Sequence, residues 1–493
     1  MTNGLLQKPP SIAAMHELLL QLRMEAYLVG GYVRDSLLGR ESPDIDMAVR
    51  GDALYVARTM AEELGGRFVL LDRDNNIGRV VFNLPKGYLC LDISSYADSI
   101  ESDLARRDFS VDAMAVEVSD WIARGPSARL IDPYQGRADA DARLLRAIGD
   151  SVFRDDPVRL LRVLRLGSEL GLRIEQETEL LIRRDATLVA SVPGERVREE
   201  LVRILNVSGA AGSLVRMHQM GLLLAVFPEL TPASGFEQNG AHTWDVLTHS
   251  LNTVLAAEYL IRQGDWEYGP EDLKSGVEWP EETSAHFAGQ VGHGSTRATM
   301  LKLAALFHDV AKPQTKSVHE GGKWHFYGHP QVGAALVRSA LERLRFSNRE
   351  IELVETEVLH HLRPAQMTQG DVPTRRAVYR YFRDTGGAGR DVFFLALADY
   401  LATYGPRLDS IDWERQTGLM RHVFAECRRQ GAETTDRKLI DGHDMIVSFG
   451  LVPGPHLGAL LAAVEEAQAA GEISTREEAL ALVQRQIESG GAS

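Results

Sequence analysis

The stretch Tyr27–Val49, YLVGGYVRDSLLGRESPDIDMAV, constrains this chain most, because it sets a glycine pair just ahead of two alternating aspartates. The glycines are Gly30 and Gly31, and the aspartates are Asp44 and Asp46. In a β-strand, the side chains of residues i and i+2 lie on one face. The segment DIDMAV therefore predicts a strand that carries both carboxylates on the same side. Two such carboxylates suit Mg²⁺, which prefers oxygen ligands and often keeps phosphates as partners.

The glycine pair adds a second element of the same chemistry. A Gly-Gly turn that leads into a helix lets backbone N–H groups approach a phosphate, since no Cβ stands in the way. Together the two features predict metal-assisted phosphoryl or nucleotidyl transfer, with two ions clamping the attacking and leaving oxygens. A lone D-x-D is more often an ordinary surface strand or turn, so the prediction depends on the motifs that follow.

The overall charge limits the range of partners. The chain of 493 residues has a formal net charge of −15, from 54 basic and 69 acidic residues. This balance argues against unspecific coating of nucleic acid, but it allows RNA binding by a local basic surface. Arginines crowd the region 137–173 and would supply such a surface.

Cysteine usage and hydropathy indicate the compartment. Cys90 and Cys427 are far apart in sequence and form no disulfide framework or zinc pattern, which fits a reducing cytosol. No stretch reaches the ~18 apolar residues needed to span a bilayer. We therefore expect a soluble, cytoplasmic protein that does not associate with membranes.

Periodicity along the chain predicts an α+β protein in four parts. We expect an α/β head over residues 1–150, an all-helical neck over 151–235, a helical domain over 236–428 and a helical tail over 429–493. In the head, β-branched and aromatic residues predict strands at RFVLL, GRVVFN and GYLCLDIS, followed by a helix over Leu104–Met114. In the third part, residues 263–296 are rich in Gly, Glu and Trp without clear periodicity, which predicts a loop insertion.

Further polar motifs follow in the head and neck. Asp92 lies in the expected strand LCLDIS and is a candidate third metal ligand, or a base for an attacking hydroxyl. In RRDFSVDAMA, Arg107 and Asp108 are expected to open a helix. In FRDDPVRLLRVLRL, Asp156 and Arg159 stand three residues apart, which predicts neighbours on one helix face. Such a fixed acceptor and donor can recognise the edge of a nucleobase.

The order and spacing of these motifs resemble the class II tRNA nucleotidyltransferase and bacterial poly(A) polymerase family, of the polymerase-β-like superfamily. The matching patterns are LVGGxVRDxLLGRxxxDxD, RRDFxxNAMA, DPxxGxxD, (E/D)DPxRxLRxxR and ERxxxEL, the last within GERVREEL here, and they cover the chain to about residue 230. The resemblance implies a polymerase-β-like head that adds C or A from CTP or ATP to the 3′ acceptor end of tRNA and releases pyrophosphate. It implies that Asp44 and Asp46 hold Mg²⁺ and that Asp156 and Arg159 pair with the incoming base. The residues implied to bind the nucleotide are Gly30, Gly31, Arg34, Arg107, Asp108, Asp112, Asp156, Arg159, Arg162 and Arg165.

The chain departs from the family pattern at three places, of which Asp155, where the family usually has Glu, is the mildest change. Asp112 stands where the family usually has Asn, which is expected to weaken a sugar or nucleotide contact. The segment between Asp92 and Arg106 is short, with no basic flexible stretch. In this family that region helps to switch specificity from C to A, so C-only or A-only addition stays open beside full CCA addition and poly(A) synthesis.

A second constellation of histidines and aspartates runs through the helical half, in the order H…HD…H…H…D. His308 shares a helix stripe with Leu301 and should point inward, and the adjacent His-Asp pair offers two ligands to one metal. This series resembles the HD phosphohydrolase superfamily. The metal ligands it implies are His249, His308, Asp309 and Asp399, with His329 and His361 at positions that often bind a second metal or the phosphate.

The resemblance to HD proteins implies a divalent transition metal or Mg²⁺ in this site. It leaves two alternatives open: a second hydrolytic activity beside nucleotidyl transfer, or a protein that is mainly a metal-dependent phosphohydrolase of nucleotides or cyclic phosphates. The sequence does not define the oligomeric state.

Overall fold

The computed structural model describes residues 10–85, 87–238, 243–269, 273–318, 324–367, 372–434 and 438–490. The chain forms two compact units, one of residues 1–192 with 220–225 and one of residues 193–219 with 226–493. The boundary after Val192 falls inside the expected neck, and the division into four parts remains a prediction. None of the helices in these described ranges is long and apolar enough to cross a bilayer.

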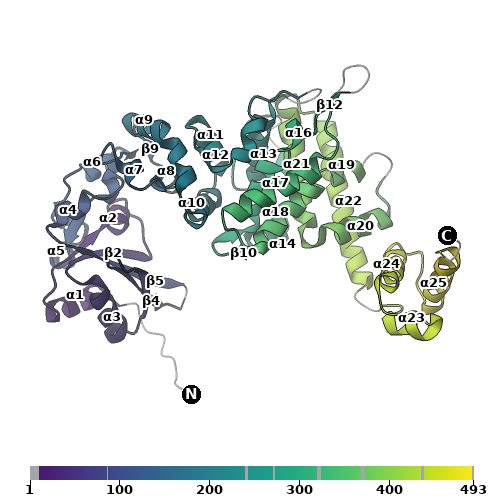
Figure 1. Cartoon of the computed structure of the whole chain (residues 1–493), viewed down its shortest axis with the longest axis horizontal. Helices are drawn as coiled ribbons and strands as arrows, with labels where there is room; N and C mark the ends of the chain where they lie inside the picture. The colour runs from purple at the N-terminus through teal and green to yellow at the C-terminus, as the bar shows by residue number, and fades with distance from the viewer. Residues whose placement is uncertain are drawn as a thin grey trace. The chain divides into compact units, whose positions relative to one another are not determined.

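The first unit contains a seven-stranded sheet, of which Figure 1 labels β2, β4 and β5. Its strands have the order β3-β4-β5-β2-β1-β6-β7. Strands β2 and β5 are parallel, and all other neighbours are antiparallel. All the strands expected in the head are confirmed. The bounds are β1 Ala26–Val29, β2 Asp44–Arg50, β3 Arg67–Asp72, β4 Ile77–Asn83, β5 Tyr88–Tyr96, β6 Ala115–Glu117 and β7 Leu130–Ile131.

One face of this sheet carries the core, and the other carries the polar motifs. Helices α1 (Ile12–Gln21) and α3 (Ala53–Leu64) pack their apolar residues against alternate side chains of β2 and β5, among them Ile45 and Leu91. Because side chains alternate along a strand, the carboxylates between these core residues are on the opposite face. The burial of the apolar residues thereby fixes the direction in which the D-x-D pair points.

The expected helix over Leu104–Met114 is wrong. Helix α4 (Ile100–Leu104) ends where that helix should begin, and only a short 3₁₀ turn follows at Ser110–Asp112. Asp108 accepts a hydrogen bond from the backbone N–H of Phe109 at 3.0 Å, a local bond that competes with helix formation. Arg107 and Asp108 therefore lie in a turn and do not open a helix.

The expectation that Asp156 and Arg159 share a helix face is also wrong. Helix α8 (Arg159–Leu170) begins only at Arg159, and Asp156 has extended backbone angles, φ −148° and ψ 99°. The residue before a proline is pushed out of the helical region by the proline ring, and Pro157 follows Asp156. Asp156 lies in the turn that connects α7 to α8.

The remaining helices of the first unit support these motifs. They are α2 Gly30–Leu37, α5 Val118–Arg124, α6 Gly136–Asp141, α7 Val152–Asp155 and α9 Gln176–Asp185. Helix α12, Leu222–Val226, lies at the boundary between the two units.

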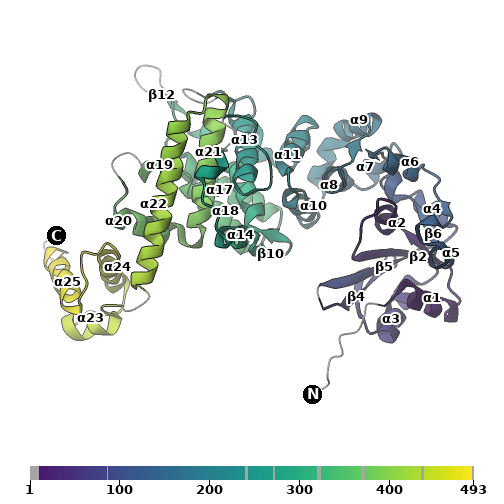
Figure 2. The same cartoon turned by 180° about the vertical axis from the view of Figure 1, so that it is seen from behind.

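The second unit is mostly helical, as expected. Figure 2 shows its longest helix, α22 (Ser410–Thr434), which packs against α20 and α21. The other helices up to the tail are α10 Gly194–Asn206, α11 Ala210–Gln219, α13 Val246–Leu260, α15 Arg297–Phe307, α17 His329–Arg343, α18 Asn348–His360, α19 Arg363–Met367, α20 Arg375–Thr385 and α21 Gly389–Tyr404. The tail helices α23 (Gly442–Phe449), α24 (Pro455–Ala469) and α25 (Arg476–Gly490) share a small core of their own.

The predicted loop insertion over residues 263–296 is wrong from Glu281 onward, where a helix and two short strands are present. It holds helix α14 (Glu281–Ala288) and the antiparallel pair β10 (Gln290–Gly292) and β11 (Ser295–Thr296), while residues 270–272 lie outside the described ranges. The ring of Trp279 stacks on Phe287, with centroids 6.0 Å apart and an interplanar angle of 4°. Both rings also contact Phe394 of α21, with centroids 5.9 and 4.8 Å away, and such tertiary packing leaves no periodic signal in the sequence.

Candidate active sites

The D-x-D pair lies on strand β2, beside strand β5. In the parallel register Asp46 stands directly across from Asp92, and Asp44 is across from Cys90. Asp44 is exposed and Asp46 is half-buried. Because neighbouring residues in register share a face, the three carboxylates project from the side of the sheet that α1 and α3 leave open.

The carboxylate of Asp46 reaches the N-terminus of helix α2. It accepts a hydrogen bond from the backbone N–H of Tyr32, and a Cβ added to Gly31 would lie only 3.2 Å from its Oδ2 atom. Burial raises the pKa of the Asp46 carboxyl, and Asp92 and Asp112 add to the rise, although Arg107 opposes it. A cation bound here would relieve this repulsion between carboxylates.

Because Gly30 has no side chain, Arg107 can lie close to the N-terminus of helix α2. The φ of Gly30, +62°, lies in the left-handed region, and a Cβ added there would stand 2.5 Å from Nη1 of Arg107. Asp103 holds this guanidinium, with Oδ2 3.2 Å from Nη2 of Arg107. The N–H of Gly30 donates to the carbonyl of Met114 at 3.2 Å, and that of Tyr32 donates to Asp46. An anion at the start of α2 would therefore meet the positive end of the helix and a fixed positive charge. The sequence analysis missed Asp103, although its i, i+4 spacing from Arg107 was an available signal.

Two ion pairs connect the segment Arg106–Ala115, called the RRD segment below, to helices α2 and α8. Arg34 Nη1 lies 2.5 Å from Asp112 Oδ1, and Arg162 Nε lies 2.5 Å from Asp108 Oδ2. Burial alone would raise the pKa of Asp108, but Arg162 and Arg159 outweigh it and the net shift is downward. Asp112, the departure from the family's usual Asn, is thus the charged partner of Arg34.

The remaining neck residues are placed differently from one another. Arg159 donates from Nη2 to the backbone carbonyl of Arg106 at 2.8 Å, so it lies against the RRD segment. The Asp156 carboxylate accepts from the backbone N–H of Val158 at 3.4 Å. The side chain of Arg165 is buried, with Nη1 3.1 Å from Glu169 Oε2, one turn further along α8.

Asp92 has a partner that the sequence analysis missed. Arg79 on β4 stands across from it in the antiparallel register and donates to both carboxylate oxygens, at 2.6 and 2.7 Å. Only the pairing of β4 with β5 brings Arg79 and Asp92 together, and no spacing rule along the chain predicts it. This bidentate pair engages the candidate third metal ligand.

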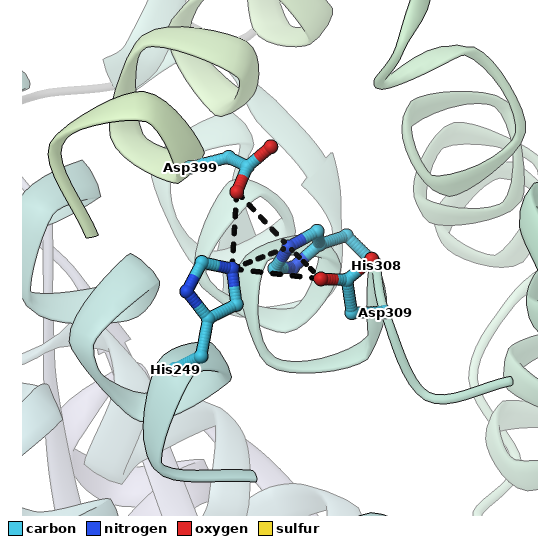
Figure 3. Close-up of side chains that lie close together, drawn as sticks. All are labelled: His249, His308, Asp309 and Asp399. Carbon is cyan, nitrogen blue, oxygen red and sulfur yellow. Dashed lines mark hydrogen bonds and ion pairs between the residues drawn. The ribbon is translucent and has the colours of Figure 1, made fainter. Parts of the chain in front are cut away.

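The second site is a cluster of histidines and aspartates from helices of the second unit (Figure 3). His249 comes from α13, Asp399 comes from α21, and His308 with Asp309 follow the end of α15. His249 Nε2 lies 3.0 Å from Asp399 Oδ1 and 3.3 Å from His308 Nε2. His308 Nε2 lies 3.2 Å from Asp309 Oδ2. Donor atoms bonded to one ion at about 2.0–2.2 Å lie roughly 3–3.6 Å from one another, so this set fits a metal.

Three of the cluster histidines are oriented by the same kind of hydrogen bond, from the ring to a backbone carbonyl. The Nδ1 atoms of His308, His329 and His361 lie 2.9, 2.8 and 2.7 Å from the carbonyl oxygens of the residues three positions earlier. Nδ1 is therefore the donor, and Nε2 of each ring is left as a ligand that faces the cluster. Such outer hydrogen bonds are typical of metal-ligating histidines, since they fix the tautomer.

Asp309 joins the first ligand set to a second one. Its Oδ2 faces His249 and His308, and its Oδ1 lies 3.3 Å from Nε2 of His329, which in turn is 3.3 Å from Nε2 of His361. Among the described residues, these two sets are the groups of His, Cys, Asp or Glu whose ligand atoms lie within 4.8 Å of one another. The structure therefore places all six HD-type residues together, and Asp309 belongs to both ligand sets, with one carboxylate oxygen in each.

The protonation of the cluster shows what a cation would replace. Although burial opposes it, Asp309 and Asp399 raise the pKa of His308 to about 10. Burial and the nearby His308 lower the pKa of His361 to about 3. The two carboxylates therefore favour positive charge at His308, the same preference that a bound cation would satisfy.

Three protein-family models match this chain, one in the head, one in the neck and one in the helical part that follows. The Poly A polymerase head domain matches residues 26–86 and 86–146, and the probable RNA and SrmB-binding site of polymerase A matches residues 171–234. The HD domain matches residues 246–404. The first match holds the D-x-D face, and the last holds all six cluster residues.

Similar proteins align along nearly the whole chain. An A-adding tRNA nucleotidyltransferase of Deinococcus radiodurans is 32% identical, over 94% of this chain and 96% of its own. A CC-adding tRNA nucleotidyltransferase of Thermus thermophilus is 31% identical, over 93% of each chain. The fold is similar to that of a Thermotoga maritima CCA-adding enzyme complexed with tRNA, at a TM-score of 0.60 and 21% identity over 97% of this chain and 94% of that one. The chain belongs to the class II tRNA nucleotidyltransferase and poly(A) polymerase family, with a poly(A) polymerase head, an RNA-binding region and an HD domain.

Proposed function

We propose that this tRNA nucleotidyltransferase carries a partial activity, adding either C residues or the terminal A to the tRNA 3′ end, so that the CCA end is completed together with a second enzyme. The observation that carries the nucleotidyl-transfer site is the juxtaposition of Asp44 and Asp46 with the start of α2, where Arg107 lies over Gly30. Negative ligands for a cation and positive donors for a polyphosphate meet at one helix end.

Each group of the head has a definable part in the transfer. Asp44 and Asp46 would hold Mg²⁺, which supplies Lewis-acid activation of the 3′-hydroxyl and neutralises the triphosphate. The start of helix α2 at Gly30 and Gly31, with Arg107 and Arg34, would receive the β- and γ-phosphates as pyrophosphate leaves the α-phosphate. Their charge lies where negative charge accumulates during bond breaking, which is the condition for stabilising a transition state.

Two observations support a partial activity. The relatives that align with this chain over more than 90% of its length include A-adding and CC-adding enzymes. The segment between Asp92 and Arg106 is taken up by the end of β5 and the short helix α4, and it contains no insertion. The same segment is the one in which the family resemblance locates the change from C to A.

The test uses three tRNA transcripts that end before CCA, after C and after CC. Each is incubated with the full chain, Mg²⁺ and CTP, ATP or both, and the products are resolved at single-nucleotide resolution. We expect extension of only one class: CC on the first two transcripts, or A on the third. Completion to CCA by this chain alone would contradict the partial activity, and a long A ladder would show a poly(A) polymerase.

We further propose that the HD cluster is a metal-dependent phosphohydrolase site. The supporting observation is the convergence of four Nε2 atoms and two aspartates, with the tautomers of His308, His329 and His361 already fixed. The His308→Ala and Asp309→Ala variants should lose hydrolysis of nucleotides or cyclic phosphates while they keep nucleotide incorporation. Hydrolysis that persists in both variants would contradict this second proposal.

A further inference from the structure

A cavity of about 470 Å³ lies in the second unit, next to the C-terminal end of helix α13. Arg262 and Gln263, which directly follow the C-cap residue of α13, form one part of its wall. Phe287 and Ala288 of helix α14 belong to another part. None of these lining residues belongs to the D-x-D face or to the histidine–aspartate cluster. The cavity is therefore separate from both candidate active sites.

The guanidinium of Arg262 is held in place but lacks a negative partner. Its Nη2 atom donates to the backbone carbonyls of Lys274 and Val277, at 3.1 and 3.3 Å, and its Cζ atom lies 5.3 Å from the ring centroid of Trp279. Nη1 is buried and has no hydrogen-bond partner among the described residues. Burial lowers the pKa of Arg262, and the phenol of Tyr259 opposes this only in part. A buried positive charge without a counter-charge is costly, so a bound anion would stabilise it.

The next residue along the chain offers a hydrogen-bond acceptor. Oε1 of Gln263 is buried, and within the described part of the chain it also lacks a partner. An unpaired buried acceptor costs free energy, which a donor on a ligand would recover. Ile261, Phe287 and Ala288 give the same wall an apolar part. The wall therefore combines one positive charge, one unpaired acceptor and an apolar surface.

We propose that this cavity binds a small organic acid that has one carboxylate, a hydroxyl or amino donor beside it, and an apolar side chain. The carboxylate would accept a hydrogen bond from Nη1 of Arg262, and the donor would pair with Oε1 of Gln263. The apolar group would contact Phe287. This binding site is additional to both proposed activities.

Charge and size favour a single carboxylate over a phosphate ester. Hydrogen bonds between a guanidinium and a carboxylate are short and strong, because both groups are charged. A phosphate monoester carries close to two negative charges at neutral pH. Among the described residues that line the cavity, Arg262 is the only charged side chain, so the second charge would lack a partner. The volume lies within the range of about 300–1,000 Å³ that ligand sites occupy, and it can hold an acid of this kind.

The first test uses 2-hydroxy-4-methylpentanoate as the probe, since it has all three groups. Isothermal titration calorimetry on the full chain should show saturable binding. The amide of the probe, which has no charge, should bind at least about tenfold more weakly, the scale of one charge-assisted hydrogen bond. 4-Methylpentanoate, which lacks the hydroxyl, should bind about two- to tenfold more weakly. Absence of saturable binding would overturn the proposal, and so would inorganic phosphate that displaces the probe at equal concentration.

Two variants locate the bound probe. Arg262→Gln removes the charge, and Ala288→Phe fills part of the cavity from an exposed position on α14. Each should weaken binding of the probe at least about tenfold. Ala285→Phe is the matched control, because Ala285 is exposed on the same helix but lies outside the cavity wall, and its affinity should equal that of the wild type. Unchanged affinity in Ala288→Phe would overturn the proposal even if circular dichroism shows that Arg262→Gln does not fold.

Discussion

The two sites of this molecule hold their candidate metal ligands in opposite ways. In the head, Asp44 and Asp46 project from one face of a sheet, and Asp44 is exposed to solvent. In the second unit, His249, His308 and Asp309 converge from several helices and are almost fully buried. An open carboxylate face suits a cation that arrives and leaves with each nucleotide, whereas a buried cluster with fixed tautomers suits a resident metal.

The two sites also differ in the positively charged groups that pair with their carboxylates. Arginines balance the head carboxylates: Arg34 pairs with Asp112, and Arg79 pairs with Asp92. In the cluster, Lys312 supplies a positive charge, with its Nζ 2.6 Å from Asp309 Oδ2, and the remaining partners of the carboxylates are histidines. Arginine keeps its charge at any physiological pH and offers a fork that matches phosphate oxygens. The head is therefore suited to receive a polyanion, and the cluster is suited to hold a metal.

The largest effect is expected for Asp46→Ala, which should abolish the function of the head and leave the histidine–aspartate cluster unchanged. Asp46→Ala removes one of the two D-x-D carboxylates, and nucleotide incorporation into tRNA should fall by on the order of 10³-fold or more, because the electrostatic stabilisation of the leaving pyrophosphate is lost. The metal content of the second unit, measured by mass spectrometry, should not change. Circular dichroism should show an intact fold. Undiminished incorporation in both Asp44→Ala and Asp46→Ala would disprove the D-x-D assignment.

The reciprocal variant tests the cluster. His308→Ala removes a ligand whose Nε2 faces two aspartates, and its metal affinity should fall by at least about 10–100-fold, the range seen even for outer-shell changes. Incorporation into tRNA should stay within twofold of wild type. His360→Ala is the matched control, because His360 is only half-buried and stands outside the ligand sets that the described residues form. Equal metal loss in both variants would contradict the cluster geometry.

The sequence predicted the parts of each site that are close together along the chain. The alternation in DIDMAV placed Asp44 and Asp46 on one face correctly, because the apolar residues between them had to be buried. The six cluster residues, which are far apart along the chain, followed from the resemblance of the H…HD…H…H…D series to HD proteins, and local periodicity gave an inward direction for His308 alone. Arg79, which pairs with Asp92, was not predicted, since the pairing of β4 with β5 brings it to its site.

The errors in local structure have equally physical causes. The helix expected through Arg107 and Asp108 is a turn, because the Asp108 side chain bonds to the adjacent backbone N–H. Residues 263–296 lack clear periodicity, which predicts a loop, but Trp279 and Phe287 pack on Phe394, far away in the sequence. In both segments, an interaction that the hydrophobic pattern does not reveal determines the secondary structure.

An intermediate effect is expected from the buried pair in the head. Asp112→Asn keeps an acceptor near Arg34 Nη1 but removes its charge, so the unit should lose about 1–3 kcal/mol of stability. The measurement is the melting temperature of the full chain, where each kcal/mol corresponds to about 2–4 °C for a unit of this size. Asp35→Asn is the control, since Asp35 also contacts Arg34 but is more exposed. A gain in stability for Asp112→Asn would show that Arg34 has no need of a charged partner.

The smallest effect, and the one that most sharpens the comparison, concerns Arg79. Its pair with Asp92 is partly exposed, at 36% and 24% of the two side chains, so solvent screening limits its worth to about 1 kcal/mol or less. If Arg79 and a cation compete for the Asp92 carboxylate, Arg79→Met should lower the Mg²⁺ concentration for half-maximal incorporation by up to about fivefold, the equivalent of 1 kcal/mol. Arg124→Met, which breaks an exposed pair with Asp120, is the control and should not change it. A higher Mg²⁺ requirement in Arg79→Met would instead mean that Arg79 orients Asp92 as a ligand. The head would then resemble the cluster, where outer contacts position the groups that bind metal.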